Sequence, residues 1–337
     1  MVNVLVTGGA GFIGSNFIRY ALDAHADWQI TNLDKLTYAG RMETLTDLAG
    51  NPRHTFVHGD VADAQVAAPL VKAADIVVHF AAETHVDRSI LEAGAFIRTD
   101  VIGTFVLLEA ARSAQKLKSF IQISTDEVYG SVPDGSSVET DELKPRNPYS
   151  ASKAGADRLA YSYWATYGVP VIITRASNNY GPYQFPEKVI PLFITNALDD
   201  IPVPLYGAGL NIRDWMHVND HCRGIDAVIA RGTAGEVYNI GGGNEVRNVD
   251  LTHKLLALAG RPPSLIKPVQ DRQGHDMRYS LDTGKLRKLG WSPQVAFDEG
   301  LKNTVEWYRN NEWWWRPIKE NDPAFRAYYQ AQYGTRA

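Results

Sequence analysis

The chain has 337 residues, of which 45% are hydrophobic and 21% are charged, and its formal net charge is −4. This length suits two domains, or one large domain with an elaborated appendage, and the apolar fraction is enough for a sizeable core. No block of like charge stands out, which argues against a general binder of nucleic acids or of membrane surfaces, since both need a basic face.

The cellular compartment is the next property that the composition constrains. Cys222 is the only cysteine, so no internal disulfide is possible, and a single thiol fits a reducing compartment. The apolar, β-like residues 2–6 are not preceded by the charged region of a secretory signal. No apolar run approaches the roughly 18–20 residues that cross a bilayer. We therefore expect a cytoplasmic protein with neither a membrane nor a nucleic acid as partner.

The first two-thirds of the chain alternates β-like and helix-like segments, which is typical of a parallel sheet covered by helices. The expected strands are residues 2–6, 29–33, 54–58, 75–80, 119–123 and 169–174. The expected helices are residues 12–24, 63–73 and 96–114. The pattern predicts an α/β fold: a Rossmann-type doubly wound parallel sheet with a smaller C-terminal α/β substrate domain.

After about residue 177 the rhythm changes to proline-rich loops and shorter elements. Residues 213–231 again have the pattern of a strand followed by a helix, as if the chain returned to the first domain. We therefore expect the first domain to contain residues 1–177 plus about 212–235, and the second to contain 178–211 plus about 236–337. The tail carries Trp313, Trp314 and Trp315; consecutive aromatics on a helix cannot all face one side, so some should be exposed or cover a neighbouring subunit.

A glycine-rich motif, Thr-Gly-Gly-Ala-Gly-Phe-Ile-Gly at residues 7–14, follows the first strand and opens the first helix. Such glycines allow a tight turn and let a pyrophosphate approach the backbone at the positive end of the helix. Asp34 closes the second strand twenty residues beyond Gly14, where a carboxylate binds the ribose hydroxyls and repels a 2′-phosphate. The pattern favours NAD over NADP. Asp60 after the third strand is placed to meet adenine, although an isolated Asp there is more often a helix N-cap.

A second motif places Tyr149 and Lys153 four residues apart on a helix that Pro148 begins, so both project from one face. Tyrosine has an ordinary pKa near 10 and is a poor base at neutral pH. An ammonium about 4 Å away, at an effective dielectric near 20, is worth about 4 kcal/mol or roughly three pKa units. We therefore expect Lys153 to bring the pKa of Tyr149 toward 7, as a general base requires. Standing alone, such a pair would as often be an ordinary surface pair.

The third motif is Thr125, Asp126 and Glu127 at the end of a β-like run, where open α/β sheets bind their ligands. Two carboxyls of different protonation state are what proton abstraction combined with departure of a hydroxyl requires. The alternative for this triplet is a turn cap.

Together these motifs resemble the extended short-chain dehydrogenase/reductase family, and more narrowly the dTDP-glucose 4,6-dehydratases. The resemblance covers nearly the whole chain, including residues 34–40, 81–89, 177–183, 185–188, 212–215 and 238–242. The Thr-Asp-Glu triplet discriminates best. Related 4-epimerases carry small hydroxyl or alanine residues in place of Asp126 and Glu127, and decarboxylases and GDP-mannose dehydratases have a Thr-Ser-Glu-like triplet.

The resemblance implies NAD as cofactor, dTDP-glucose as substrate and dTDP-4-keto-6-deoxyglucose as product. In that chemistry Tyr149 takes the proton from the sugar O4, Lys153 holds the cofactor ribose, and Thr125 hydrogen-bonds near O4. Glu127 removes the C5 proton and Asp126 protonates the departing 6-hydroxyl. The first domain would bind NAD and the second the sugar nucleotide.

The resemblance also implies two sets of binding residues. The cofactor set is Gly8, Gly11, Phe12, Ile13, Gly14, Asp34, Lys35, Leu36, Thr37, Asp60, Val61, Ala81, Ala82, Thr99, Tyr149, Lys153 and Asn179. The substrate set is Thr84, Thr125, Asn178, Lys188, Val189, Pro204, Tyr206, Arg213, Asn248, Arg272 and His275. The chain departs from the family pattern at Gln273, where a proline is expected, which puts the rigidity of that loop in doubt more than the substrate class.

Three further expectations concern metals, assembly and competing functions. The spacing of His217, His221, Cys222 and His275 fits no tetrahedral metal site, so we expect no metal.

The resemblance implies a homodimer, in which the wide apolar arcs of the helices near 96–114 and 149–167 would pair. The alternatives are another NAD-dependent nucleotide-sugar modifier (a UDP-sugar 4-epimerase, a decarboxylase or a 4,6-dehydratase of another nucleotide sugar) and a catalytically silent binding module. Silent relatives usually lose the Tyr or the Lys, and this chain has both.

Overall fold

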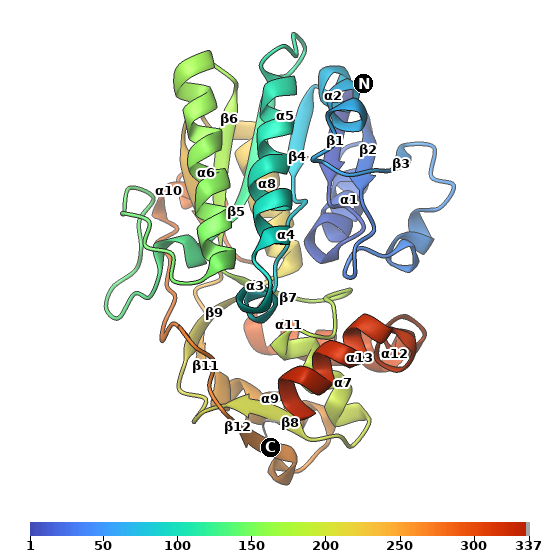
Figure 1. Cartoon of the computed structure of the whole chain (residues 1–337), viewed down its shortest axis with the longest axis vertical. Helices are drawn as coiled ribbons and strands as arrows, with labels where there is room; N and C mark the ends of the chain where they lie inside the picture. Colours follow the sequence, from blue (N-terminus) through green and yellow to red (C-terminus); the bar gives the residue numbers. More distant parts are fainter. Residues whose placement is uncertain (335–337) are drawn as a thin grey trace.

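The computed structural model describes residues 1–334, and its large part is built on one parallel β-sheet (Figure 1). The strand order among the described residues is β10-β6-β5-β4-β1-β2-β3. The strands are β1 (Val2–Thr7), β2 (Trp28–Asp34), β3 (His54–His58), β4 (Ile76–His79), β5 (Ser119–Thr125), β6 (Val171–Ala176) and β10 (Val237–Ile240). The strand order reverses at β1, which pairs with β2 on one side and with β4 on the other. This is the doubly wound topology expected from the sequence.

Helices cover both faces of this sheet and create two apolar cores. One face packs on α1 (Phe12–Ala24) and α8 (Val218–Arg231), and the other on α2 (Ala64–Ala73), α5 (Thr104–Ala111) and α6 (Pro148–Tyr167). Because successive strand residues point to opposite faces, Val4 and Val6 enter the first core and Leu5 enters the second. Burial on both faces explains why these strands are continuous apolar runs rather than alternating ones.

The helix expected at residues 96–114 is divided into three segments. They are α4 (Gly94–Phe96), the wider π-helical turn η2 (Ile97–Gly103) and α5. Single π-helical turns inside helices are frequent at functional sites, and η2 carries the buried carboxyl of Asp100.

The start of α6 follows directly from its sequence. The side chain of Asn147 accepts a hydrogen bond from Ser150 N at 2.9 Å, and Ser150 Oγ accepts one from Asn147 N at 3.3 Å. This reciprocal capping box, with Pro148 at the first helical position, fixes where the helix begins. It therefore fixes Tyr149 in the first turn.

The small part is built from short sheets and five helices of the described chain. A three-stranded sheet joins β11 (Glu245–Arg247), β9 (Ile212–His217) and β7 (Asn178–Tyr180), and a two-stranded sheet joins β12 (Ile266–Val269) and β8 (Val203–Tyr206). The helices are α7 (Val189–Leu198), α9 (Asn248–Ala259), α11 (Phe297–Asn310), α12 (Glu312–Asn321) and α13 (Pro323–Tyr329). The remaining short elements are α3 (Val86–Leu91), α10 (Gly284–Arg287), η1 (Met42–Leu48), η3 (Asp126–Tyr129), η4 (Pro263–Leu265) and η5 (Gln330–Gly334).

Two strands belong to a different sheet from the one that the sequence boundaries imply. The strand near residue 213 was expected to return to the large sheet, but β9 pairs with β7 and β11 in the small part. Conversely, β10 falls after residue 236 and yet pairs in parallel with β6 at the edge of the large sheet. Only helix α8 returns as expected. Short apolar strands look alike in sequence whichever sheet they join, because pairing partners leave no local signal.

The three consecutive tryptophans of α12 face three different directions. Trp313 is 53% exposed, whereas Trp314 and Trp315 are buried. Trp315 donates a hydrogen bond from Nε1 to Tyr308 O at 2.7 Å, and Trp314 donates one to Thr44 Oγ1 of η1 at 3.1 Å. One aromatic is therefore exposed, as the sequence predicts, and the other two anchor the helix.

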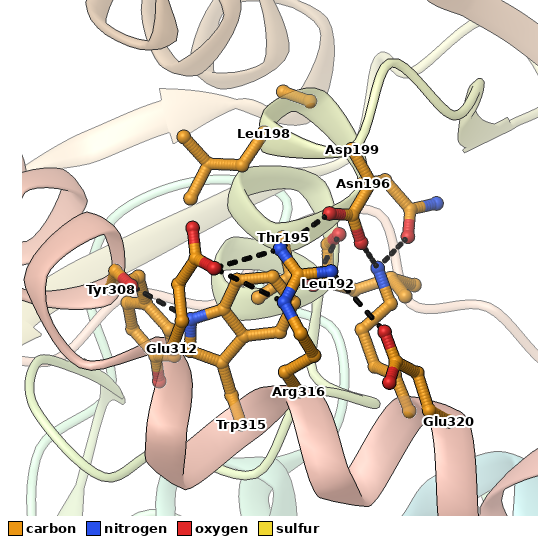
Figure 2. A network of polar contacts seen from close by, with 12 residues as sticks. Leu192, Thr195, Asn196, Leu198, Asp199, Tyr308, Glu312, Trp315, Arg316 and Glu320 are labelled. Atoms are coloured by element: carbon orange, nitrogen blue, oxygen red, sulfur yellow. Dashed lines mark hydrogen bonds and ion pairs between the residues drawn. The ribbon is translucent and has the colours of Figure 1, made fainter.

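A polar network fastens α12 to the carboxyl end of α7 (Figure 2). Arg316 pairs with Asp199 at 3.1 Å, and Lys319 contacts both Asp199 Oδ2 and Asn196 Oδ1 at 3.1 Å. Cations next to a helix C-terminus are favourable because the unpaired carbonyls there carry partial negative charge. The network holds the C-terminal helices against the small part.

None of the helices between residues 1 and 334 combines the length and apolarity that a bilayer crossing needs. Cys222 is buried as a free thiol.

Candidate active site

A deep cleft lies beyond the carboxyl ends of the large sheet, beside the point where the strand order reverses. Its volume is about 320 Å³, and it is lined by the glycine loop, by the ends of β2, β4, β5 and β6, and by residues 184–189 of the small part. A second cavity of about 160 Å³ lies between this cleft and the small part. The two share a wall made by Thr84, Glu127, Asn178, Glu187, Lys188, Val189 and Trp215. An elongated ligand can therefore reach from one into the other.

The glycine loop forms the floor of the first cavity. A Cβ on Gly8, whose φ is +73°, would lie 2.7 Å from Ala81 N, and one on Gly14 would collide with Gly8 O. Gly11 starts α1 without any side-chain cap, so the N–H groups of the first turn remain free for an anion. The loop thus fits the pyrophosphate of a dinucleotide.

Asp34 lies at the end of β2 and is almost fully buried beside the glycine loop. Its Oδ2 accepts a hydrogen bond from Ala10 N and its Oδ1 one from Leu36 N, both at 2.8 Å. Burial raises the pKa of Asp34, and the two N–H donors counteract that rise. Through its hydrogen bond with Ala10 the carboxylate therefore also stabilises the conformation of the glycine loop, a role that the sequence did not predict.

Asp60 lies on the wall of the first cavity, but it is not the helix N-cap that was the alternative expectation for this residue. Its Oδ2 pairs with Lys35 at 2.9 Å, and its Oδ1 accepts a hydrogen bond from Ala62 N at 2.9 Å. Burial raises its pKa, but the hydrogen bond and charge of Lys35 leave that pKa below its usual value. The N-cap of α2 is Asp63 instead.

The first cavity brings together every residue of the expected cofactor set except Leu36. The side chain of Leu36 packs against the apolar core on the α1 side of the sheet, and its φ of +55° turns it away while its N–H binds Asp34. The residues on the wall are Gly8, Gly11, Phe12, Ile13, Gly14, Asp34, Lys35, Thr37, Asp60, Val61, Ala81, Ala82, Thr99, Tyr149, Lys153 and Asn179.

The expected substrate set is divided between the two cavities. Thr125 lines the first cavity, whereas Thr84, Asn178, Lys188 and Val189 line both. The second cavity alone is lined by Pro204, Tyr206, Arg213, Asn248, Arg272 and His275.

Several residues of the second cavity were missed by the sequence analysis. His85, Asp87 and Glu187 lie on its wall inside motifs that were noted without a role for these side chains. Tyr333 also lines it but lies in a C-terminal tail where no motif marks it. The long sequence separation between Tyr333 and the other wall residues left no signal that could have found it.

The second cavity brings three cationic side chains together, Lys188, Arg213 and Arg272, beside the carboxyl residues Asp87, Glu127 and Glu187. Arg213 and Lys188 are buried, and burial lowers the pKa of each. Arg272 lies 3.6 Å from Asp87, and burial lowers the pKa of His275 to about 4, which keeps its imidazole neutral. Guanidinium groups match the geometry of phosphate oxygens, so this cluster suits a diphosphate.

The Thr-Asp-Glu triplet lies where β5 ends and η3 begins. Thr125 accepts a hydrogen bond from Glu127 N at 3.3 Å and donates one to Asp126 Oδ1 at 3.1 Å. Burial, followed by the nearby Glu127 carboxylate, raises the pKa of Asp126 well above its usual range. Within residues 1–334, Asp126 Oδ2 has no hydrogen-bond partner. A protonated carboxyl with a free oxygen is suited to act as a general acid.

The electrostatics at Tyr149 differ from the sequence expectation. Burial raises the pKa of Tyr149 well above 10, and the carboxylates of Glu127, Asp100 and Asp126 add to the rise. Lys153 donates to Ile123 O at 2.7 Å, and burial lowers its own pKa. The expected fall of the Tyr149 pKa toward 7 is therefore wrong, because burial and three nearby carboxyl groups outweigh one desolvated ammonium.

Asp100 is a further buried carboxyl at this site that the sequence analysis did not single out. Its Oδ1 accepts a hydrogen bond from Glu83 N at 2.9 Å, and its Oδ2 accepts one from Ser152 Oγ at 2.6 Å. Burial raises its pKa to about 6, against the opposing charge of Lys153. Asp100 thus joins the cofactor-side loop to the helix that carries Tyr149 and Lys153.

The histidines and the cysteine considered for a metal have other surroundings. His217 accepts a hydrogen bond from Asn219 N at 3.2 Å at the start of α8, and His221 contacts Asn179 Oδ1 at 3.0 Å. Across the part of the chain that the structure describes, no group of three or more His, Cys, Asp or Glu side chains is arranged to hold a metal ion.

Comparison with known proteins agrees with this geometry. The family model described as GDP-mannose 4,6 dehydratase matches residues 5–304. A dTDP-glucose 4,6-dehydratase of Streptomyces niveus is 52% identical over 96% of this chain and 97% of its own length. The crystal structure of DesIV, a dTDP-glucose 4,6-dehydratase of Streptomyces venezuelae with NAD and dTDP bound, is 53% identical with a TM-score of 0.92. It covers 94% of this chain and 100% of its own.

The chain belongs to the dTDP-glucose 4,6-dehydratase family. A UDP-glucuronic acid 4-epimerase of Bacillus cereus has nearly the same fold, with a TM-score of 0.86 over 91% of this chain and 99% of its own, but is only 27% identical. The two proteins thus share a fold although only about a quarter of their residues are identical.

The raised pKa of Asp100 predicts a pH-dependent effect of Asp100→Asn on stability. A carboxyl whose folded pKa of about 6 exceeds its ordinary 3.8 stabilises the fold below pH 3.8, and this contribution is lost as pH rises toward 6. Since two pKa units correspond to roughly 3 kcal/mol, the neutral amide should raise the free energy of unfolding by about that amount at pH 8. Near pH 4 it should change little. Urea denaturation at both pH values measures the difference.

Asp63→Asn is the matched control, because Asp63 is an exposed cap and asparagine caps helices equally well. Equal or lower stability of Asp100→Asn at pH 8 would show that the buried carboxylate of Asp100 carries no net cost.

Proposed function

We propose that the chain is an NAD-dependent dTDP-glucose 4,6-dehydratase that forms dTDP-4-keto-6-deoxyglucose. The observation that carries this proposal is the triplet Thr125, Asp126 and Glu127 in the same cleft as Tyr149 and Lys153. Relatives at about 50% identity over nearly the full length are named for this activity. An intact Tyr and Lys beside a fitted glycine loop argue against a silent binding module.

The two cavities divide the ligands between them. Residues of the glycine loop, Asp34 and Lys153 would hold NAD, which when bound accepts the hydride from C4 and later returns it to C6. The cations Lys188, Arg213 and Arg272 would hold the diphosphate of the sugar nucleotide. We assign the NAD domain to residues 1–177 together with α8 and β10, and the sugar-nucleotide domain to the remainder, which includes β9.

The first chemical step is removal of the hydroxyl proton at C4 of the sugar. Tyr149 would take this proton, and Thr125, which lines the same cavity, would hold the sugar O4. Burial and the carboxyl groups of Glu127, Asp100 and Asp126 raise the pKa of Tyr149. A positive charge nearby favours the phenolate, so Lys153 is the group that would assist the loss of its proton.

Elimination of water follows at C5 and C6. Oxidation at C4 makes the C5 proton acidic because the resulting carbanion is an enolate. Glu127, whose carboxylate lines both cavities, would remove this proton. Asp126, kept neutral by burial, would protonate the departing 6-hydroxyl. Two adjacent carboxyls in different protonation states perform opposite proton transfers at one site.

A C4 epimerase is the competing activity on this fold. An epimerase needs no acid to expel a hydroxyl, so a protonated Asp126 beside Glu127 has no task in that reaction. The geometry supports the dehydratase for this reason, and the identity of 27% to the solved epimerase against 53% to DesIV supports the same choice.

We also propose a cytoplasmic homodimer. Large apolar side chains are exposed on the neighbouring segments η2, α5 and α6, which lie side by side on the outer face of the sheet (Figure 1). They are Ile97, Ile102, Phe105, Tyr161 and Tyr167. A contiguous apolar patch of this kind is typical of a subunit contact. A cytoplasmic location is supported by the single cysteine, buried as a free thiol.

The substrate assignment predicts selective turnover. Among dTDP-glucose, UDP-glucose, GDP-mannose and CDP-glucose, we expect dTDP-glucose to give the 4-keto-6-deoxy product with the highest kcat/KM, read as alkali-induced absorbance and confirmed by mass spectrometry. A product that retains its 6-hydroxyl and differs only in configuration at C4 would identify an epimerase instead.

The division of labour predicts that Glu127→Gln and Asp126→Asn fail at different steps. Glu127→Gln should still form bound NADH on mixing with substrate but should not exchange the C5 hydrogen with deuterated solvent. Asp126→Asn keeps the base, so C5 exchange should persist while water elimination slows by about 10²-fold or more, the scale of one general-acid contribution. Tyr149→Phe should form little NADH. Dehydration by Asp126→Asn at the wild-type rate would show that the acid is another group.

The proposed subunit contact predicts a dimer by analytical ultracentrifugation at micromolar concentration. Phe105→Asp, which places a charge in the exposed patch, should shift the chain toward the monomer, because an unpaired charge is costly to bury. Trp313→Asp is the control, since Trp313 is similarly exposed but lies on α12, away from this patch. A wild-type monomer would refute the assignment.

A further inference from the structure

Two loops from opposite parts of the molecule face each other across the first cavity. Residues 35–40 follow β2 in the large part, and Thr37, Ala39 and Gly40 line the cavity from that side. Residues 184–188 belong to the small part and line the same cavity through Gln184, Phe185, Glu187 and Lys188. A ligand on the glycine loop is therefore enclosed between them.

Tyr38 and Arg88 connect these two loops. The ring of Tyr38 packs edge-on against Phe185, with ring centroids 5.4 Å apart and planes at 87°. The guanidinium of Arg88 lies 4.1 Å from the centre of the Tyr38 ring, and its Nε donates to Glu187 Oε2 at 2.9 Å. We call these four residues, Tyr38, Phe185, Arg88 and Glu187, the bridge.

The bridge is largely buried. The side chain of Glu187 is 1% exposed and that of Arg88 is 22% exposed, and the guanidinium of Arg88 also lies 4.6 Å from the centre of the Tyr328 ring. Burial raises the pKa of Glu187 while the charge of Arg88 opposes that rise. A guanidinium that contacts two aromatic rings and a buried carboxylate is worth more than an exposed ion pair.

Further contacts join the same side of the large part to the small part. Thr44 accepts the hydrogen bond of Trp314 at 3.1 Å, and Arg41 lies 3.6 Å from Asp322. On the other side of the glycine loop, Asn16 Nδ2 donates to Pro182 O at 3.0 Å. The segment that follows β2 on the cofactor side of the first cavity is thus attached to the small part at several points. Among these contacts, the bridge is the one next to the cavity.

Tyr38 and Arg88 do not lie on the wall of either cavity. Their side chains therefore act on the ligand only through the loops that they join. Substitution of either residue therefore tests whether the joined loops retain the ligand, without removing a side chain that lines the ligand cavity.

We propose that the bridge retains the dinucleotide in its site between the two hydride transfers. The inference rests on the proposed function, in which the hydride taken from C4 must return to C6 of the same sugar. If the reduced cofactor leaves in between, the sugar has lost a hydride and a proton and remains a 4-keto sugar nucleotide with its 6-hydroxyl or its 5,6-alkene, while NAD has become NADH. Retention prevents this loss at every turnover.

Arg88→Met and Tyr38→Ala test the proposal on the full chain loaded with NAD. NAD retained per chain is measured after rapid desalting without any sugar nucleotide, which tests the bridge independently of the substrate assignment. During turnover of dTDP-glucose, lactate dehydrogenase with pyruvate reports escaped NADH, and mass spectrometry reports sugar nucleotides that were oxidised but not reduced again. Circular dichroism and Tm establish that each variant is folded.

Both variants should lose NAD roughly three- to tenfold faster than the wild type, because a partly buried cation–π contact is worth up to about one factor of ten in affinity. Their turnover should depend on added NAD and recover toward the wild-type kcat when NAD is saturating. Tyr38→Phe keeps the ring and should retain NAD like the wild type.

Arg316→Met is the matched control. Arg316 also lies over an aromatic ring, Trp315 at 4.7 Å, and pairs with carboxylates, among them Asp199 (Figure 2), but it is remote from both cavities. It should retain NAD like the wild type. If Arg88→Met does not fold, Tyr38→Ala decides the question. Wild-type rates of NAD loss in the folded bridge variants, or equal losses in Arg316→Met, would overturn the proposal. Failure of the wild type to turn over dTDP-glucose would instead overturn the proposed function.

Discussion

The pairing of β1 with β2 on one side and β4 on the other opens the crevice on which the whole site depends. Chain connections leave this point in opposite directions, so the carboxyl ends of the central strands are free to carry ligand-binding loops. The glycine loop ends β1, Asp34 ends β2 and Thr125 ends β5. The small part covers these ends, which removes water from the ionisable groups and determines their protonation.

Burial, rather than any single charge pair, controls the electrostatics of this crevice. It raises the pKa of Asp126, Tyr149 and Asp100 and lowers that of Lys153. These groups are therefore driven toward their neutral forms, because an unpaired charge is costly in a site of low dielectric. A neutral Asp126 suits its proposed role directly. Tyr149 differs, since a base must lose its proton and burial opposes that loss.

Local patterns in the sequence were enough to predict the large sheet and most of the cleft. The glycine loop, Asp34 and the triplet at Thr125 each follow a strand, and parallel strands must bring their ends together. The sheet partners of β9 and β10, the π-helical turn around Asp100 and the place of Tyr333 on the cavity wall were not predicted. Each depends on contacts between distant segments, as does the pKa of Tyr149, which reflects burial and carboxyl groups from two segments, η3 with Asp126 and Glu127 and η2 with Asp100.

The consecutive tryptophans of α12 illustrate how one local feature can serve separate long-range contacts. Side chains of successive helical residues point about 100° apart, so Trp313, Trp314 and Trp315 cannot share a partner. Trp315 packs inside the small part, Trp314 reaches Thr44 of the large part, and Trp313 remains exposed. Asp199 fixes the same helix from its other side through Arg316 and Lys319. Helix α12 therefore joins the two parts of the molecule through the contact of Trp314 with Thr44.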